Sequence, residues 1–397
     1  MTKIKANRTV VLIILGLLSA IGPFSIDLYL PAFDTIATDY DVSIDRVQLS
    51  LSSFFVGVAL GQMIYGPLLD KYGRKKPLIF GLALYCVASL LCTTASSVEQ
   101  LIVFRFLQAL GSCSGMVAAR AMVRDYYDSQ EAAKVFSLLM LVIAVSPILA
   151  PSFGAFLIAH FDWHYLFIVL FVLGALILAA TIFILPESYQ GNKNFSLKPA
   201  AIVQKFWAVL INPTFLTYCA VGSIASAGLY AYLAGSSFVM QQVYGLTESQ
   251  YGLAFAFVAF AMLTATQLNR FFLNRWHSIK ISIIANGWHS LVGVSLIFFY
   301  YTGLLSFPIL LIGTFFYLFG HGFIFPNTSA MALTPFKELA GSASALLGCV
   351  QMALGGVASA AVSYLHDGTA LPMIGVMCAC AVLALIIHLF TRIWVFS

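Results

Sequence analysis

Asp27 is the one carboxylate of this chain that falls inside an apolar segment long enough to cross a membrane. An ionised carboxylate in hydrocarbon costs about 3 kcal/mol on insertion scales. An acid at such a position in a hydrophobic chain is a candidate group for binding and releasing a proton. The alternative interpretation is a carboxylate near the outer membrane interface, where water relieves it beside Pro31.

The second embedded charge is Arg105, which opens the run 105–111 in another apolar segment. A membrane-embedded arginine rarely serves packing alone. At 1.5 Å of helix rise per residue, both charges are predicted to fall in the outer half of the bilayer. A neighbouring cation and burial have opposite effects on the ionisation of an acid. The sequence therefore leaves the ionisation state of Asp27 open.

Membrane helices must position these two charges. The chain has 397 residues, of which 61% are hydrophobic and 9% are charged. A soluble domain has about 25% charged residues, so a soluble fold is excluded. The seven cysteines lie in apolar segments without metal-ligand spacing. We therefore expect small buried cysteine side chains, no bound metal and no cofactor.

Twelve apolar segments are predicted to span the membrane, because a crossing helix needs about 20 apolar residues. Their hydrophobicity is continuous rather than alternating, which excludes a transmembrane β-barrel. The predicted fold is therefore all-α. The segments are 9–33, 47–69, 77–97, 100–120, 132–158, 165–185, 207–233, 250–272, 280–300, 307–332, 340–362 and 372–392.

The basic residues predict the orientation of these helices. With twelve spans, every Lys and Arg except Arg46 and Arg105 falls on one side of the membrane or beside it. The positive-inside rule then places both termini in the cytoplasm.

The longest charged connection follows the sixth segment and predicts a division of the chain into two halves. We expect an N-terminal six-helix half at 1–185, a cytoplasmic linker at 186–206 and a C-terminal six-helix half at 207–397. A weak echo between 40–43 and 244–247 supports this division. Parallel six-helix halves are a known plan of secondary transporters.

A loop motif stands between the second and third segments, at 66–77. Its glycines permit a tight turn. The order G-x-L-x-D-x-x-G-R-K-K resembles the signature of the major facilitator superfamily. The resemblance implies that this loop latches the cytoplasmic gate. The residues that match are Gly66, Asp70, Gly73 and Arg74.

Two further motifs narrow the resemblance. The run from Arg105 is similar to the helix-4 motif R-x-x-Q-G-x-G of that superfamily, with Ala109 in place of a usual glycine. Pro147, Pro151 and Gly154 resemble the helix-5 motif of its antiporter branch, although the common pattern is G-P-x-x-G-G. With 27–32, 120–125 and 340–346, these features are similar to the Bcr/CflA drug-resistance family. In relatives the arginine influences protonation of an acid on helix 1 or nearby.

The resemblance also implies a substrate cavity lined by the first and seventh helices. Aromatic cavity walls suit amphiphilic substrates through non-directional contacts. Packing within the bundle is the alternative role for each side chain. The expected cavity residues are Tyr29, Phe33, Gln108, Tyr230, Tyr232, Phe238 and His321.

The function implied is proton-coupled export of drugs or small amphiphilic metabolites across the bacterial inner membrane, with Asp27 and Arg105 in proton coupling. The alternative is a dedicated exporter of one metabolite, such as a siderophore, nucleoside or sugar derivative. An uptake symporter is less well supported, and no motif indicates an enzyme or a channel. The expected partners are a small-molecule substrate, protons and membrane lipid, without nucleic acid, and the chain is expected to work as a monomer.

Overall fold

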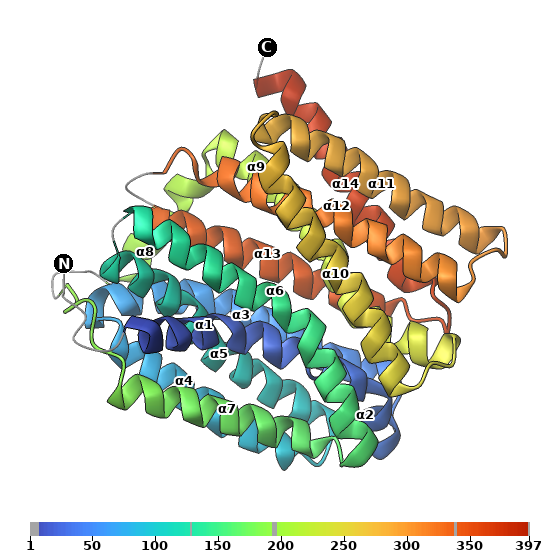
Figure 1. The fold of residues 1–397 in the computed structure, drawn as a ribbon, viewed down its shortest axis with the longest axis horizontal. Coiled ribbons are helices and arrows are strands. Elements are labelled where there is room, and N and C mark those ends of the chain that lie inside the picture. Colours follow the sequence, from blue (N-terminus) through green and yellow to red (C-terminus); the bar gives the residue numbers. More distant parts are fainter. Residues whose placement is uncertain (1–7, 128, 193–196, 337–339, 396–397) are drawn as a thin grey trace.

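The computed structural model describes residues 8–127, 129–192, 197–336 and 340–395. Over these ranges the secondary structure is helical, with no strand (Figure 1). The helices are α1 (Arg8–Asp27), a 3₁₀ turn (Leu30–Ala32), α2 (Phe33–Asp39), α3 (Ile44–Tyr72), α4 (Lys75–Thr93), α5 (Val98–Tyr126), α6 (Ser129–His160), α7 (His164–Phe183), α8 (Pro199–Leu210), α9 (Pro213–Ser237), a π-helical turn (Phe238–Val243), α10 (Glu248–Phe272), α11 (Ser278–Tyr301), α12 (Phe307–Leu333), α13 (Ala340–Tyr364) and α14 (Leu371–Val395).

The prediction of twelve membrane-spanning helices is confirmed. Among the described residues, 11 helical segments are long and apolar enough to cross a membrane. The twelfth is α6, which has 32 residues and includes the shorter apolar stretch Val145–His160.

The first span is interrupted, whereas the sequence predicted one helix over 9–33. Its first helix, α1, ends at Asp27, and the 3₁₀ turn leads into α2. Pro31 has no backbone N–H, so it cannot donate the helical hydrogen bond to the carbonyl of Asp27, four residues earlier. The interruption therefore places Asp27 at the end of a helix.

The predicted helix at 207–233 also begins differently. It is divided between α8 and α9, and α8 was not expected. The side chain of Asn212 accepts a hydrogen bond from the backbone N–H of Phe215 at 3.1 Å, and Pro213 occupies the first turn of α9. An Asn cap followed by proline starts a new helix.

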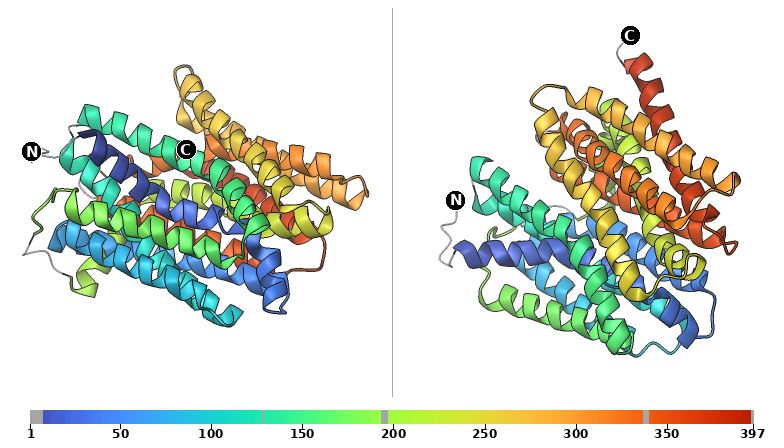
Figure 2. Two further views of the ribbon diagram at one scale, coloured as in Figure 1. Left: turned by 60° about the horizontal axis from the view of Figure 1, so that its bottom comes forward. Right: turned by 45° about the vertical axis from the view of Figure 1, so that its right-hand side comes forward.

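The helices form two packed groups. The first contains α1 and α3–α7, and the second contains α9–α14; the groups meet mainly through α3 against α13 and α6 against α10. In Figures 1 and 2, α6 and α10 meet at one end of the bundle and diverge toward the other. The two six-helix groups confirm the predicted fold, and the boundaries 1–185, 186–206 and 207–397 stay a prediction.

We call the end of the bundle that carries the α3–α4 turn the motif end, and the opposite end the distal end. Side-chain hydrogen bonds between the two groups, among described residues, lie in the distal half. Ser52 Oγ donates to Ser359 Oγ at 2.8 Å, and Ser363 Oγ donates to the carbonyl of Asp45 at 2.6 Å. A third bond joins Gln242 to Asp34. The two groups are therefore bonded to each other toward the distal end.

Candidate functional site

Asp27 lies buried at the end of α1, with 4% of its surface exposed. Ser146 of α6 donates a hydrogen bond from Oγ to Asp27 Oδ2 at 3.3 Å. Within the described ranges, Asp27 makes no ion pair. Its carboxyl group is thus held by one neutral hydroxyl, an arrangement that accommodates both a charged and a protonated acid.

The second group of helices also faces this acid. The 3₁₀ turn after Asp27 contacts α6, α9 and α10. The last two of these helices carry Tyr230 on α9 and Tyr251 on α10, both buried. The Tyr230 ring packs 4.6 Å from the ring of Phe55 on α3, measured between centroids. Asp27 therefore lies where the two groups meet.

The proline-containing part of α6 packs directly against the turn that follows Asp27. A Cβ atom at Gly154 would lie 2.3 Å from the carbonyl oxygen of Leu28 and 3.4 Å from Cγ of Pro31. Glycine at this position permits that approach. Pro147 and Pro151 lie inside α6, and each removes one helical hydrogen bond. The predicted antiporter motif thus flanks the predicted proton-binding residue.

Arg105 on α5 is fully buried among aromatic rings. Its Cζ lies 4.5 Å from the ring centroid of Tyr29, 4.3 Å from that of Phe54 and 5.8 Å from that of Phe167. Cation–π contacts contribute about 2 kcal/mol or more when shielded from water. Aromatic faces, rather than an acid, therefore surround this guanidinium.

Hydrogen bonds connect Arg105 to α1 and α4. Its Nη2 donates to the carbonyl of Ser25 at 3.1 Å, and its Nη1 donates to Gln108 Oε1 at 2.6 Å. Gln108 Nε2 in turn donates to Ser89 Oγ at 2.8 Å. The bond to Ser25 reaches the backbone two residues before Asp27. The structure therefore brings Arg105 to the last turn of α1, which carries Asp27, without an ion pair between the two charges in the described ranges.

The other predicted cavity residues are packed within the bundle. Phe33 is fully buried against Tyr29, with centroids 5.1 Å apart, and Tyr232 stacks on Phe255 at 5.6 Å. Phe238 opens the π-helical turn and packs against a histidine ring at 4.3 Å. Tyr29 also hydrogen bonds through its hydroxyl to Ser50 at 2.9 Å. These contacts show a packing role for each side chain, and a substrate role stays a prediction.

His321 belongs to a buried cluster that the sequence did not reveal. His289 on α11 lies 3.7 Å from the Tyr317 ring and 6.2 Å from the His321 ring on α12, between centroids. Neither ring nitrogen of His289 has a hydrogen-bond partner among the described residues. Asn286 and His289 are polar residues three positions apart, so they lie on the same face of a helix. This spacing is the sequence feature that could have indicated the cluster. The described residues contain no cluster suited to a metal.

The loop motif forms a network at the motif end. Arg74 donates from Nη1 to Asp70 Oδ1 and from Nε to Asp125 Oδ2, both at 2.8 Å. Its Cζ also lies 4.6 Å from the ring centroid of Tyr189. Burial lowers the pKa of the Arg74 guanidinium, but the bonds to Asp125 and Asp70 outweigh it and hold the pKa above its ordinary value. This network links α3, α5 and the segment after α7, all on the side of the first group.

Glu187, which no sequence motif singles out, completes this network. Its carboxylate accepts hydrogen bonds from the backbone N–H groups of Arg74 at 2.9 Å and Lys75 at 3.1 Å. A carboxylate at the start of α4 satisfies free donors and interacts favourably with the helix dipole. The segment after α7 therefore caps α4.

We expect Gly73→Ala to destabilise the protein by at least about 2 kcal/mol. Gly73 has φ of 86°, and a Cβ there would lie 2.7 Å from the carbonyl oxygen of Tyr189. Thermal unfolding of the purified protein in detergent measures the change. The matched control is Gly66→Ala, because a Cβ at Gly66 meets nothing within 4 Å. Equal melting temperatures for both variants would contradict the expected role of Gly73.

The fold is that of a helical membrane protein, and comparison with known proteins identifies it as a transporter. The Major Facilitator Superfamily sequence model matches residues 15–360. The chain is 32% identical to a bicyclomycin resistance protein homolog of Haemophilus influenzae over 95% of this chain and 94% of the relative. It is 27% identical to the multidrug resistance protein MdtL of Escherichia coli over 93% of this chain and 92% of that protein.

Solved structures share the fold at low sequence identity. A D-xylose–proton symporter matches with a TM-score of 0.73 and 15% identity, over 96% of this chain and 97% of that chain. A bacterial homolog of the lysosomal transporter Spinster, in an inward-facing and unoccupied conformation, matches with a TM-score of 0.70 and 14% identity, over 96% and 95% of the two chains.

The chain belongs to the major facilitator superfamily. Its relatives confirm the resemblance to the Bcr/CflA family that the sequence motifs carry. It is a multi-pass protein of the bacterial inner membrane.

Proposed function

We propose that this protein exports drugs or small amphiphilic metabolites in exchange for protons. The observation that carries this proposal is the burial of Asp27 at the contact of α1 and α6, next to the 3₁₀ turn that contacts α9 and α10 of the second group. An acid at such a contact senses both groups of helices, so its protonation biases their arrangement. The names of the two resistance-protein relatives support the substrate class.

In the proposed cycle, the protein binds a proton at Asp27 and a substrate molecule in alternation. Asp27 takes up a proton from the outside, and substrate leaves. Deprotonation toward the cytoplasm allows the next substrate to bind. Each ligand need only favour a different arrangement of the two groups for exchange to occur.

We also propose that both termini, and hence the motif end, face the cytoplasm. The distribution of Lys and Arg supports this orientation. The distal hydrogen bonds through Ser52, Ser363 and Gln242 would then close the outer side. The divergence of α6 and α10 toward the motif end (Figures 1 and 2) agrees with an arrangement open toward the cytoplasm.

The second candidate is a dedicated exporter of one endogenous metabolite. It uses the same acid and the same arrangement of helices, and differs only in the substrate.

Inverted membrane vesicles test the proposal. We expect an imposed pH gradient to drive accumulation of at least one compound from a panel of amphiphilic drugs, and a protonophore to abolish that accumulation. Vesicles without the protein provide the baseline. Accumulation that needs ATP and resists the protonophore would contradict proton exchange, whereas a panel without any transported drug would favour the metabolite exporter.

A further inference from the structure

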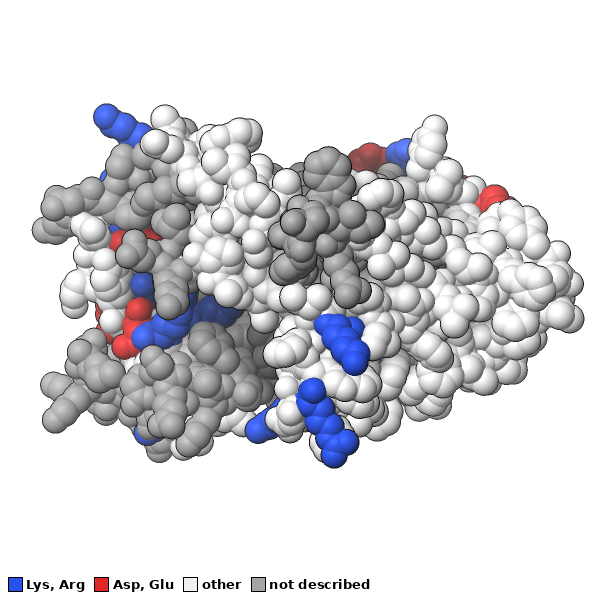
Figure 3. Space-filling model, turned by 90° about the horizontal axis from the view of Figure 1, so that it is seen from above, with Lys and Arg blue, Asp and Glu red and all other residues white. Residues whose placement is uncertain are grey.

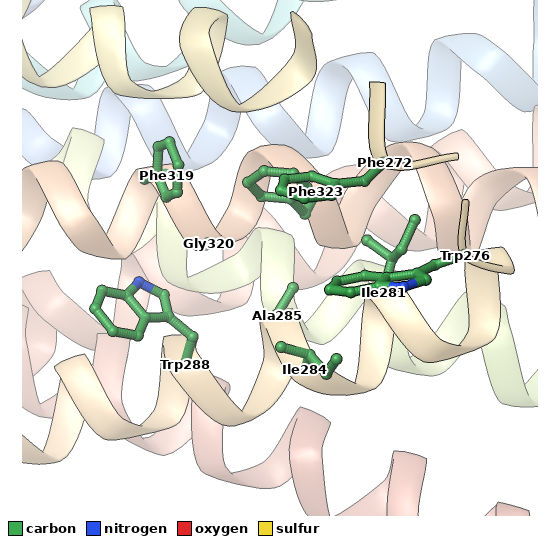
Figure 4. Close-up of a pocket in the computed structure, with 9 residues that line it drawn as sticks. All are labelled: Phe272, Trp276, Ile281, Ile284, Ala285, Trp288, Phe319, Gly320 and Phe323. Atoms are coloured by element: carbon green, nitrogen blue, oxygen red, sulfur yellow. The ribbon is translucent and has the colours of Figure 1, made fainter. Parts of the chain in front are cut away.

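The outer surface of the second group carries an apolar groove that the transport cycle above does not use (Figure 4). It has a volume of about 220 Å³, which is smaller than the roughly 300–1,000 Å³ of pockets that hold drug-sized ligands. The lining residues, none of them charged, are Phe272, Trp276, Ile281, Ile284, Ala285, Trp288, Phe319, Gly320 and Phe323.

The shape of the groove suits a narrow flexible chain. In Figure 4, Trp276 and Phe272 stand at one end and Trp288 and Phe319 at the other, with Ala285 between the two ends. The Trp276 and Phe272 rings stack at 5.4 Å between centroids. The Trp288 indole donates from Nε1 to the carbonyl of Phe316 at 3.1 Å, which fixes its ring at the far end. The two ends are therefore built by aromatic rings in defined positions.

Cations border one end of this groove. Lys280 Nζ lies 4.9 Å from the ring centroid of Trp276, which itself lines the groove. Arg275, one residue before Trp276, has its Cζ 5.9 Å from the ring centroid of Phe271. Both cations are exposed, and neither makes an ion pair with an acid in the described ranges.

The surrounding sequence supplies no counter-charge. From residue 249 to residue 337, the chain contains no Asp or Glu, although it contains Arg270, Arg275, Lys280 and Lys337. In Figure 3, which views the bundle from above, blue side chains lie over a broad white surface with no red beside them near the centre. An anion from outside the protein is therefore the natural counter-ion for this rim.

We propose that the groove binds an anionic phospholipid. One acyl chain lies between Trp276 and Trp288, and the phosphate of the headgroup interacts with Arg275 and Lys280. Basic residues at a membrane surface attract anionic lipid with about 1 kcal/mol each, or about fivefold in affinity. Apolar lining and a basic rim in one place match the two parts of such a lipid.

Native mass spectrometry of the delipidated full-length protein tests this site. We expect phosphatidylglycerol to bind more tightly than phosphatidylcholine with the same acyl chains. The double variant R275Q/K280Q should lower the phosphatidylglycerol affinity by roughly 25-fold, at about fivefold per cation. The matched control K76Q/R124Q removes two exposed cations elsewhere and should leave the affinity unchanged.

Four outcomes would overturn the proposal. Equal binding of both lipids would remove the role of the basic rim, and equal loss in both double variants would indicate a general charge effect. Glycerol 3-phosphate, a headgroup without chains, should not compete; if it did so as well as the lipid, the site would bind free phosphate instead. A dimer that persists after delipidation and blocks lipid uptake would assign the groove to a second copy of the chain.

Discussion

Replacing Asp27 with asparagine is expected to lower proton-driven export by at least about 100-fold, equivalent to about 2.7 kcal/mol in the transport barrier. Asparagine has the same size and still offers an oxygen to the hydroxyl of Ser146. It cannot release or take up a proton. The measurement is the initial rate of pH-driven substrate accumulation in inverted vesicles. The melting temperature should be unchanged or raised, because a buried ionisable group is removed.

The matched control is Asp41→Asn. Asp41 is exposed and has φ of 51°, a conformation that asparagine tolerates well. The control therefore removes the same charge from the neighbouring surface without straining the backbone. Export that survives in Asp27→Asn, or that falls equally in both variants, would remove Asp27 from the proton cycle.

Cross-linking α3 to α13 is expected to have the second-largest effect. The hydroxyl oxygens of Ser52 and Ser359 lie 2.8 Å apart, so cysteines at these positions approach the distance of a disulfide, about 2.05 Å between sulfurs. If the two groups must separate at the distal end, oxidation of S52C/S359C should reduce export by at least about tenfold, because the cross-linked protein cannot reach the other state. A reducing agent should restore the rate.

The single variants S52C and S359C, treated with the same oxidant, control for oxidation of the seven native cysteines. The fraction cross-linked is measured by the mass of a peptide pair after proteolysis. Full cross-linking with undiminished export would show that the contact between Ser52 and Ser359 persists throughout the cycle.

Much of the fold could be predicted because hydrophobic length and basic residues act locally. The apolar residues that make each helix a membrane span lie within that helix, so the sequence shows them directly. The embedded charges of Asp27 and Arg105 differ clearly from their apolar neighbours. The interruption of the first span was harder to predict from the sequence. Pro31 was visible, but its effect on Asp27 depends on a missing hydrogen bond four residues away.

The partners of the site residues could not be predicted, because they depend on how separate helices are rotated against each other. Ser146 lies 119 residues from Asp27, and its place before Pro147 in the predicted antiporter motif does not indicate which side chain its hydroxyl contacts. The same reason explains why the contacts of Tyr29 could not be predicted. The sequence predicts it as a cavity residue, which stays a prediction, and its contact with the guanidinium of Arg105 became visible only in the structure.

The solitary acid has an energetic consequence. A protein that carries one proton inward for each monovalent cation carried outward moves no net charge, so the exchange responds to the pH difference alone. A neutral substrate on the same route leaves one positive charge uncompensated, which adds about 2.3 kcal/mol of driving force for each 100 mV of membrane potential. With Asp27 as the one acid buried among the described residues, the charge of the cargo would decide which component of the proton gradient powers its export.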